Sequence, residues 1–301
     1  MFNFNKDNKN NSDAGTQLKQ DNDTINNDSE NKESSFALYL LFSNAPEVNI
    51  GNIEKKIKST GTENVKLQNL LEGEDTKNLY GFADIDGETF KLVGLDTSIP
   101  QEVSSYTVGC AYGDQEEIEA MKNHTYHIIA FYTGSNTDYN IIYNAYAKLA
   151  YGFSEDNFVG MANGYAWNAV TPSLVKGLFE DERIEEFAST PAMMVWRNFI
   201  KIPYNDKVWF VTKGNNVYGV HEYAYKGDSL DDSQQVYDMF EDIFNYEYTI
   251  DTEIRAGHTL QIGEEVFLRF KDLYEIKDDL QGEGIGTLVL ELVTRDEINL
   301  D

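Results

Sequence analysis

The sequence predicts an α+β fold in which antiparallel sheets carry helices packed on one face. Short apolar runs of strand length recur along the chain, and a few longer stretches have helical periodicity. The two kinds of element do not alternate as they do in a parallel βαβ protein. Hydrophobic residues make up 41% of the 301 residues, which is enough for one large domain or two α+β halves.

Composition divides the chain into three parts. Residues 1–35 are rich in Asn, Asp, Lys and Ser and contain few apolar groups, so we predict a disordered tail that cannot offset its ordering entropy. Regular apolar patterns begin at residue 36. We predict an α+β half over residues 36–190 and a β-rich α+β half over 191–301, because strand-like runs dominate after Pro191.

Local signals define the elements of the first half. Asp86-Gly87 is typical of a two-residue hairpin turn, Asp114 with Glu117 resembles a capping box, and Thr171-Pro172 is a typical helix start. The predicted elements are a strand at 36–42, a helix at 50–57, a polar loop at 61–78, a hairpin at 80–95, a short helix at 114–121, a strand at 124–132, a helix at 142–150, a strand at 158–161 and a helical region at 171–187.

The second half contains the clearest amphipathic helix of the chain. Its apolar residues fall at positions 236, 239, 240, 243 and 244, and Ser229 with Asp232 can cap its start. Strands are predicted at 193–202 and 208–212 around an Asn205-Asp206 turn, at 218–225, at 266–270 and at 287–293.

The chain is strongly acidic. It has 52 Asp and Glu residues against 24 Lys and Arg residues, a net charge of −28, and only −3 of that belongs to residues 1–35. Such a charge repels nucleic acid and anionic membranes and favours basic protein partners. No apolar run is long enough to span a bilayer, and the first residues have no signal-peptide pattern, so we expect a cytoplasmic protein.

Metal and cofactor sites are not expected. The single cysteine, Cys110, lies among apolar residues and is predicted to be a buried, inert thiol. His124 and His127 would point to opposite faces of a strand, so we interpret them as structural. The Gly282–Gly286 loop lacks a Lys and precedes a strand, unlike a phosphate loop, and Asp84–Gly87 is too short for a calcium loop.

The candidate catalytic residues are His221, Glu222 and His258. A histidine and a carboxylate on neighbouring strands can form an acid–base pair. A nucleophile would still be required, and the G-x-S-x-G pattern is absent from the sequence. Ordinary polar residues at strand ends are the alternative interpretation.

Several short segments resemble the bacterial domain-of-unknown-function 4261 family over residues 36–293. They are Thr212-Lys213-Gly214 with Tyr218-Gly219 and Glu222, Gly257-His258-Thr259, Gly81–Asp84 through Leu95 with Pro100, and Pro191–Trp196. The resemblance implies boundaries for the fold and no particular reaction.

Two hypotheses about function follow. The first is a non-enzymatic protein-binding module, such as an immunity-type antagonist of a basic partner. The second is an enzyme of unknown reaction with a site around His221, Glu222 and His258. The absence of a recognisable nucleophile, metal cluster or phosphate loop in the sequence favours the first.

Overall fold

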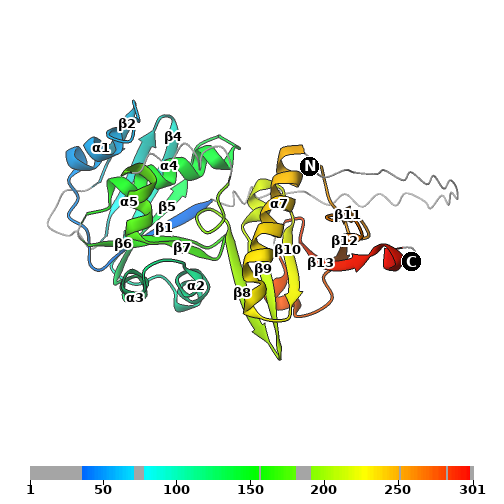
Figure 1. The fold of residues 1–301 in the computed structure, drawn as a ribbon. Helices are drawn as coiled ribbons and strands as arrows, with labels where there is room; N and C mark the ends of the chain where they lie inside the picture. Colours follow the sequence, from blue (N-terminus) through cyan, green and yellow to red (C-terminus); the bar gives the residue numbers. More distant parts are fainter. Residues whose placement is uncertain are drawn as a thin grey trace, which may run out of the picture.

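The computed structural model describes residues 36–70, 78–155, 157–180, 191–250, 252–282 and 284–298. Two sheets and separate helices give an α+β fold, which confirms the predicted class (Figure 1). The tail predicted at 1–35 and the end of the helical region predicted to 187 lie outside the described residues. In the described part, no helix has the length and apolar character needed to cross a membrane.

The first sheet has seven strands in the order β2-β3-β4-β5-β1-β6-β7, and all neighbouring pairs are antiparallel. Asp86 and Gly87 have φ angles of 53° and 93°, as a type I′ turn requires, so the predicted hairpin turn is confirmed. The strands are β1 (Ala37–Phe42), β2 (Val65–Gln68), β3 (Tyr80–Ile85), β4 (Glu88–Leu95), β5 (Tyr126–Tyr132), β6 (Phe158–Asn163) and β7 (Asn168–Val170).

Helices lie on both faces of this sheet (Figure 1). On β1, Leu38 and Leu40 belong to the core beneath one set of helices, whereas Leu41 packs with Ile118 and Met121 of the other set. The prediction that helices cover only one face is therefore wrong for this sheet, because the path of the connections decides which face a helix covers and no local pattern records that path. One face carries α1 (Ile50–Lys58), α4 (Tyr139–Gly152) and α5 (Pro172–Glu180), and the other carries α2 (Gln101–Thr107), the 3-10 helix η1 (Val108–Cys110) and α3 (Gln115–Lys122).

The second sheet has six strands in the order β11-β12-β13-β10-β9-β8. Its neighbouring strands are antiparallel except for β10 and β13, which are parallel. The strands are β8 (Asn198–Tyr204), β9 (Lys207–Lys213), β10 (Glu222–Gly227), β11 (Thr259–Gln261), β12 (Val266–Asp272) and β13 (Thr287–Thr294). The shorter helical elements here are η2 (Asn215–Tyr218), η3 (Leu230–Asp232), α8 (Lys277–Leu280) and α9 (Arg295–Ile298).

Helix α7 (Ser233–Ile250) crosses one face of the second sheet (Figure 1). Ser229 and Asp232 form the predicted capping box, although it opens η3, which leads directly into α7. The buried stripe of α7 includes Phe240 and Phe244, which pack on the sheet in one apolar core. The predicted amphipathic helix is therefore confirmed, and it extends beyond the apolar pattern of residues 236–244 at both ends.

The two halves are in direct contact. The ring of Trp196, just before β8, stacks on Tyr143 of α4 with 4.8 Å between the ring centroids. Asn198 donates hydrogen bonds to the carbonyl oxygens of Cys110 (3.2 Å) and Trp167 (2.7 Å). These contacts hold the start of the second sheet against the first half.

Five local predictions were wrong or incomplete. The strand predicted at 193–202 begins only at Asn198, because residues 194–196 form a turn. The loop predicted at 61–78 contains β2, whose buried Leu67 donates its backbone N–H to Glu54. The strand predicted from Tyr218 begins at Glu222, because residues 215–218 form η2. His124 precedes β5 and is not on it. Neither α2 nor β11 was predicted, since each has too few residues to show a period.

Candidate functional site

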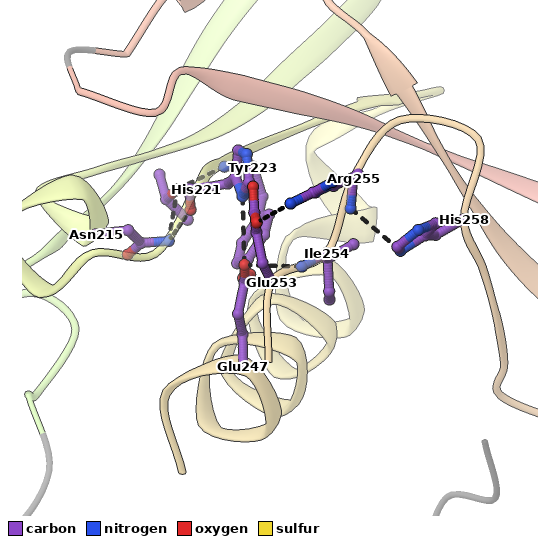
Figure 2. Close-up of polar contacts among 9 residues, drawn as sticks. Asn215, His221, Tyr223, Glu247, Glu253, Ile254, Arg255 and His258 are labelled. Carbon is purple, nitrogen blue, oxygen red and sulfur yellow. Dashed lines mark hydrogen bonds and ion pairs between the residues drawn. The ribbon is translucent and has the colours of Figure 1, made fainter. Parts of the chain in front are cut away.

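The carboxylate partner of His221 is Glu247 and not its sequence neighbour Glu222. The Nδ1 atom of His221 lies 3.2 Å from Oε1 of Glu247 on α7 (Figure 2). His221 immediately precedes β10 and is 6% exposed, and Glu247 is 4% exposed. The pair is therefore buried between the helix and the sheet.

Glu247 accepts two further hydrogen bonds. The hydroxyl of Tyr223 donates to its Oε2 atom at 2.5 Å, and the backbone N–H of Ile254 donates to Oε1 at 3.2 Å (Figure 2). Desolvation by burial raises the pKa of Tyr223 well above its ordinary value, so its hydroxyl stays protonated and remains a donor. Glu247 thus connects α7, β10 and the segment that follows α7.

The position of Glu247 follows from the helical period. It lies three residues after Phe244 and seven after Phe240, on the stripe of α7 that faces the sheet. A carboxylate on an apolar stripe needs a partner, because an unpaired buried charge is strongly unfavourable. An acidic residue at an apolar position of the helical pattern, here Glu247, is the sequence signal that could have identified this site and was missed.

His221 also lines a surface hollow of about 520 Å³, whose wall includes Arg255, Gly286 and Thr287. A histidine oriented by a carboxylate through one ring nitrogen can act as a general base through the other. The Thr287 hydroxyl donates to the Leu280 carbonyl oxygen and accepts from the Gly282 N–H, so it is already engaged. No Ser or Cys is among the described residues that line this hollow.

His258 does not join this pair. It is exposed, and its Nδ1 atom accepts a hydrogen bond from the backbone N–H of Arg255 at 3.2 Å (Figure 2). The Arg255 guanidinium in turn donates to Glu253 at 2.6 Å and lowers the pKa of that carboxyl. His221, Glu222 and His258 therefore do not converge on one point.

Glu222 lies in a separate environment. It is 1% exposed and accepts hydrogen bonds from the Thr212 hydroxyl (2.7 Å) and from the backbone N–H groups of Gly214 (2.7 Å) and Asn216 (3.3 Å). Burial raises the pKa of Glu222, and these hydrogen bonds together with the charge of Lys213 oppose that rise. Consecutive residues of an extended chain point to opposite sides, which is why Glu222 and His221 face different hollows.

The remaining candidates have local roles. His124 accepts the Ile99 N–H at Nε2 (2.8 Å) and lies 2.6 Å from the Met121 carbonyl oxygen through Nδ1, while His127 Nδ1 lies 2.7 Å from the Thr97 carbonyl oxygen. Burial lowers the pKa of both histidines, and partial burial raises that of the Cys110 thiol, which is half-buried and not fully buried as predicted. Across the part of the chain that the structure describes, no three His, Cys, Asp or Glu side chains are grouped as a metal site.

The Asp84–Gly87 segment forms the hairpin turn itself. The Asp84 carboxylate accepts the Gly87 N–H at 2.9 Å, and Asp86 accepts the Asn64 N–H at 2.9 Å. Both carboxylates therefore stabilise the turn and the strand beside it.

An acidic groove lies beside α7. Its floor and walls are formed by one stripe of α7 and by apolar residues of β11, β12 and β13, and its volume is about 250 Å³. Between residues 227 and 250 the chain contains seven acidic residues and no Lys or Arg. The lining residues are Gln235, Asp238, Met239, Asp242, Ile243, Tyr246, Leu260, Ile262, Leu268 and Leu292.

No protein-family model, curated protein or solved structure matches this chain. The resemblance to the domain-of-unknown-function 4261 family therefore stays a prediction.

Proposed function

We propose that the protein is a non-enzymatic binding module for a basic protein partner, as an immunity-type antagonist of a basic toxin would be. The single observation that supports this most is the groove beside α7, where an apolar floor is bordered by carboxylates. A partner segment that alternates apolar and basic residues matches both features at once.

The floor of the groove supplies the apolar contact. The β13 face that α7 covers begins with the buried Leu288 and Leu290 and ends with Leu292, which is 40% exposed. Leu292 pairs with Leu268 of the neighbouring strand β12, and both residues line the groove together with Met239. An apolar side chain placed here would extend the existing core, because it would cover surface that α7 leaves open.

The rim of the groove supplies the charge. Asp238 and Asp242 are exposed, lie one helical turn apart and line the groove. The net charge of −28 adds a long-range attraction for cationic surfaces and repels nucleic acid. It also repels a second copy of the chain, which disfavours self-association through this face.

The test uses a synthetic amphipathic peptide of Lys and Leu, with a Glu and Leu peptide of equal length as its counterpart. Fluorescence anisotropy should show saturable binding of the Lys peptide that weakens with salt, and no binding of the Glu peptide. The D238N/D242N double variant should weaken binding about fivefold, the effect of two surface ion pairs of ~0.5 kcal/mol each. E47Q/E63Q, which removes two exposed charges from the first half, should change it much less.

A second variant separates groove binding from general charge attraction. Leu292→Glu adds negative charge but removes the apolar contact, so it should weaken binding of the Lys peptide at least fivefold. Ile141→Glu, at an exposed position of α4, is its matched control. Tighter binding by the Leu292→Glu variant would mean that charge alone attracts the peptide, and the proposal would be wrong.

The pairing of His221 with Glu247 favours a second candidate, a general-base enzyme acting in the hollow that His221 lines. Such an enzyme needs the free ring nitrogen of His221 to be reachable. Labelling with diethyl pyrocarbonate, followed by mass spectrometry, should then modify His221 as well as the exposed His258. Modification of His258 without His221 would exclude this candidate.

A further inference from the structure

A third hollow, a cavity, lies where the two halves meet, away from the groove beside α7 and from the hollow that His221 lines. Its volume is about 420 Å³, within the range of small-molecule sites, which often form between domains. The first half contributes residues of β1, α2, β5 and the turn between β6 and β7. The second half contributes the end of β9, η2, the start of β10 and the segment after α8.

The wall from the first half is largely aromatic. Tyr39 and Phe131 come from neighbouring strands of the sheet, and Tyr106 lies against Trp167 with 5.4 Å between their ring centroids. Tyr165 completes this wall, and its ring stacks on Phe36 with 4.5 Å between the ring centroids. Aromatic faces arranged in this way suit a flat ring.

The turn that carries Trp167 is held in an unfavourable backbone conformation. Trp167 has a φ angle of 49°, which a bulky residue rarely adopts. The Asn198 side chain fixes its carbonyl oxygen at 2.7 Å, and the Asn163 carboxamide accepts the N–H of Tyr165 at 3.1 Å. Strain that the surroundings maintain is typical of binding sites, where it fixes a side chain before the ligand arrives.

The wall from the second half is polar and has balanced charge. Lys213 is 4% exposed, donates to the Gln281 carbonyl oxygen at 2.9 Å and lies 4.3 Å from the centroid of the Trp167 ring. The buried Glu222 carboxyl lines the same wall, and the positive charge of Lys213 favours its ionised form. Asn216 and Gln281 add amide groups at the cavity wall.

We infer that this cavity binds a neutral, planar heteroaromatic molecule such as a nucleoside or a compound of similar ring chemistry. The aromatic wall would stack on the ring, and the polar wall would hydrogen-bond to its edge. The opposite charges of Lys213 and Glu222 leave no net charge for an ionic ligand. Lys213 already occupies the cation position over Trp167, and the net charge of −28 repels anions.

Tryptophan fluorescence can report binding because the three tryptophans differ in exposure. Trp196 and Trp209 are 2% and 0% exposed, whereas Trp167 lines the cavity. Adenosine is the probe, and adenosine 5′-monophosphate and benzamidine are its anionic and cationic counterparts. At about 0.3 kcal/mol per heavy atom, adenosine should bind with a Kd on the order of 0.1 mM, which calorimetry can confirm.

A variant that fills the cavity with a larger side chain tests whether the ligand binds there. A Cβ atom added at Gly164 would meet only the Tyr106 hydroxyl at 3.7 Å, and the φ angle of Gly164 is not positive. Gly164→Leu should therefore fold and should weaken adenosine binding at least tenfold. Gly109→Leu is the matched control, since a Cβ atom there meets nothing within 4 Å.

Saturable binding of adenosine by the wild type and the Gly109→Leu variant, and its loss in the Gly164→Leu variant, would support the inference. It would be overturned by the absence of saturable adenosine binding up to about 5 mM, a range well above the Kd expected from ligand efficiency. An unchanged Kd in the Gly164→Leu variant would also overturn it, as would tighter binding of either charged probe.

Discussion

Replacing Glu247 with Ala should be one of the most destabilising single changes in the second half. The substitution leaves the buried Tyr223 hydroxyl, the Ile254 N–H and the His221 ring without their shared acceptor. Each unsatisfied buried polar group costs about 1–3 kcal/mol, so we expect a loss of about 4 kcal/mol in the free energy of unfolding. At roughly 3 °C per kcal/mol for a chain of this size, Tm should fall by about 12 °C.

Urea unfolding followed by circular dichroism measures this loss. Asp242→Ala, on the exposed side of the same helix, is the matched control and should change stability by no more than about 0.5 kcal/mol. Glu247→Gln keeps the shape of the side chain and one acceptor oxygen. Its loss of unfolding free energy should therefore lie between the losses of Glu247→Ala and Asp242→Ala. If Glu247→Ala lost less than about 1 kcal/mol, the reasoning about buried hydrogen-bond partners would be refuted.

Three further predictions concern pH and packing. Burial raises the folded-state pKa of Glu222 above its unfolded value, so the carboxyl favours folding at low pH and this benefit is lost as the pH rises through the folded pKa. The stability of Glu222→Gln relative to wild type should therefore increase from pH 4 to pH 7, and a constant difference in urea unfolding would contradict this. Burial lowers the folded-state pKa of His124. Its contribution to the stability of the fold is therefore present above the unfolded pKa and is lost as the pH falls through the folded pKa. NMR should find His124 neutral and protonated at Nδ1 at pH 7, because Nε2 accepts the Ile99 N–H; an Nε2-protonated ring would be the contrary result. Gly160→Ala should cost about 2 kcal/mol or more in thermal unfolding, since φ is 147° and a Cβ atom would lie 2.8 Å from the Val170 carbonyl oxygen, whereas Gly109→Ala should be nearly neutral.

Local features of the fold could be predicted from the sequence because they depend on few neighbouring residues. The Asp86-Gly87 turn and the Asp114 helix cap belong to this class. The capping box proposed at Asp114 is only half formed, because the Glu117 carboxylate instead accepts hydrogen bonds from the backbone N–H and the hydroxyl of Ser173. A tertiary contact 56 residues away decided the position of that side chain.

The candidate site could be predicted only in part. His221 was identified, but its partner Glu247 lies 26 residues later on another element. Adjacent residues of an extended chain face opposite sides, so His221 and Glu222 could have been separated from the sequence alone. The cavity around Trp167 could not be predicted from the sequence, because it forms only where the two halves of the chain pack together and no local pattern describes that packing.

The most direct test of the binding proposal is a hydrogen-exchange footprint of the wild-type protein with the Lys and Leu peptide. Protection should appear in α7 and in β11 to β13, the elements that form the acidic groove, and it should disappear in the Leu292→Glu variant. Protection centred on other acidic surfaces, or an unchanged footprint in that variant, would contradict the proposal that this groove is where a basic partner binds.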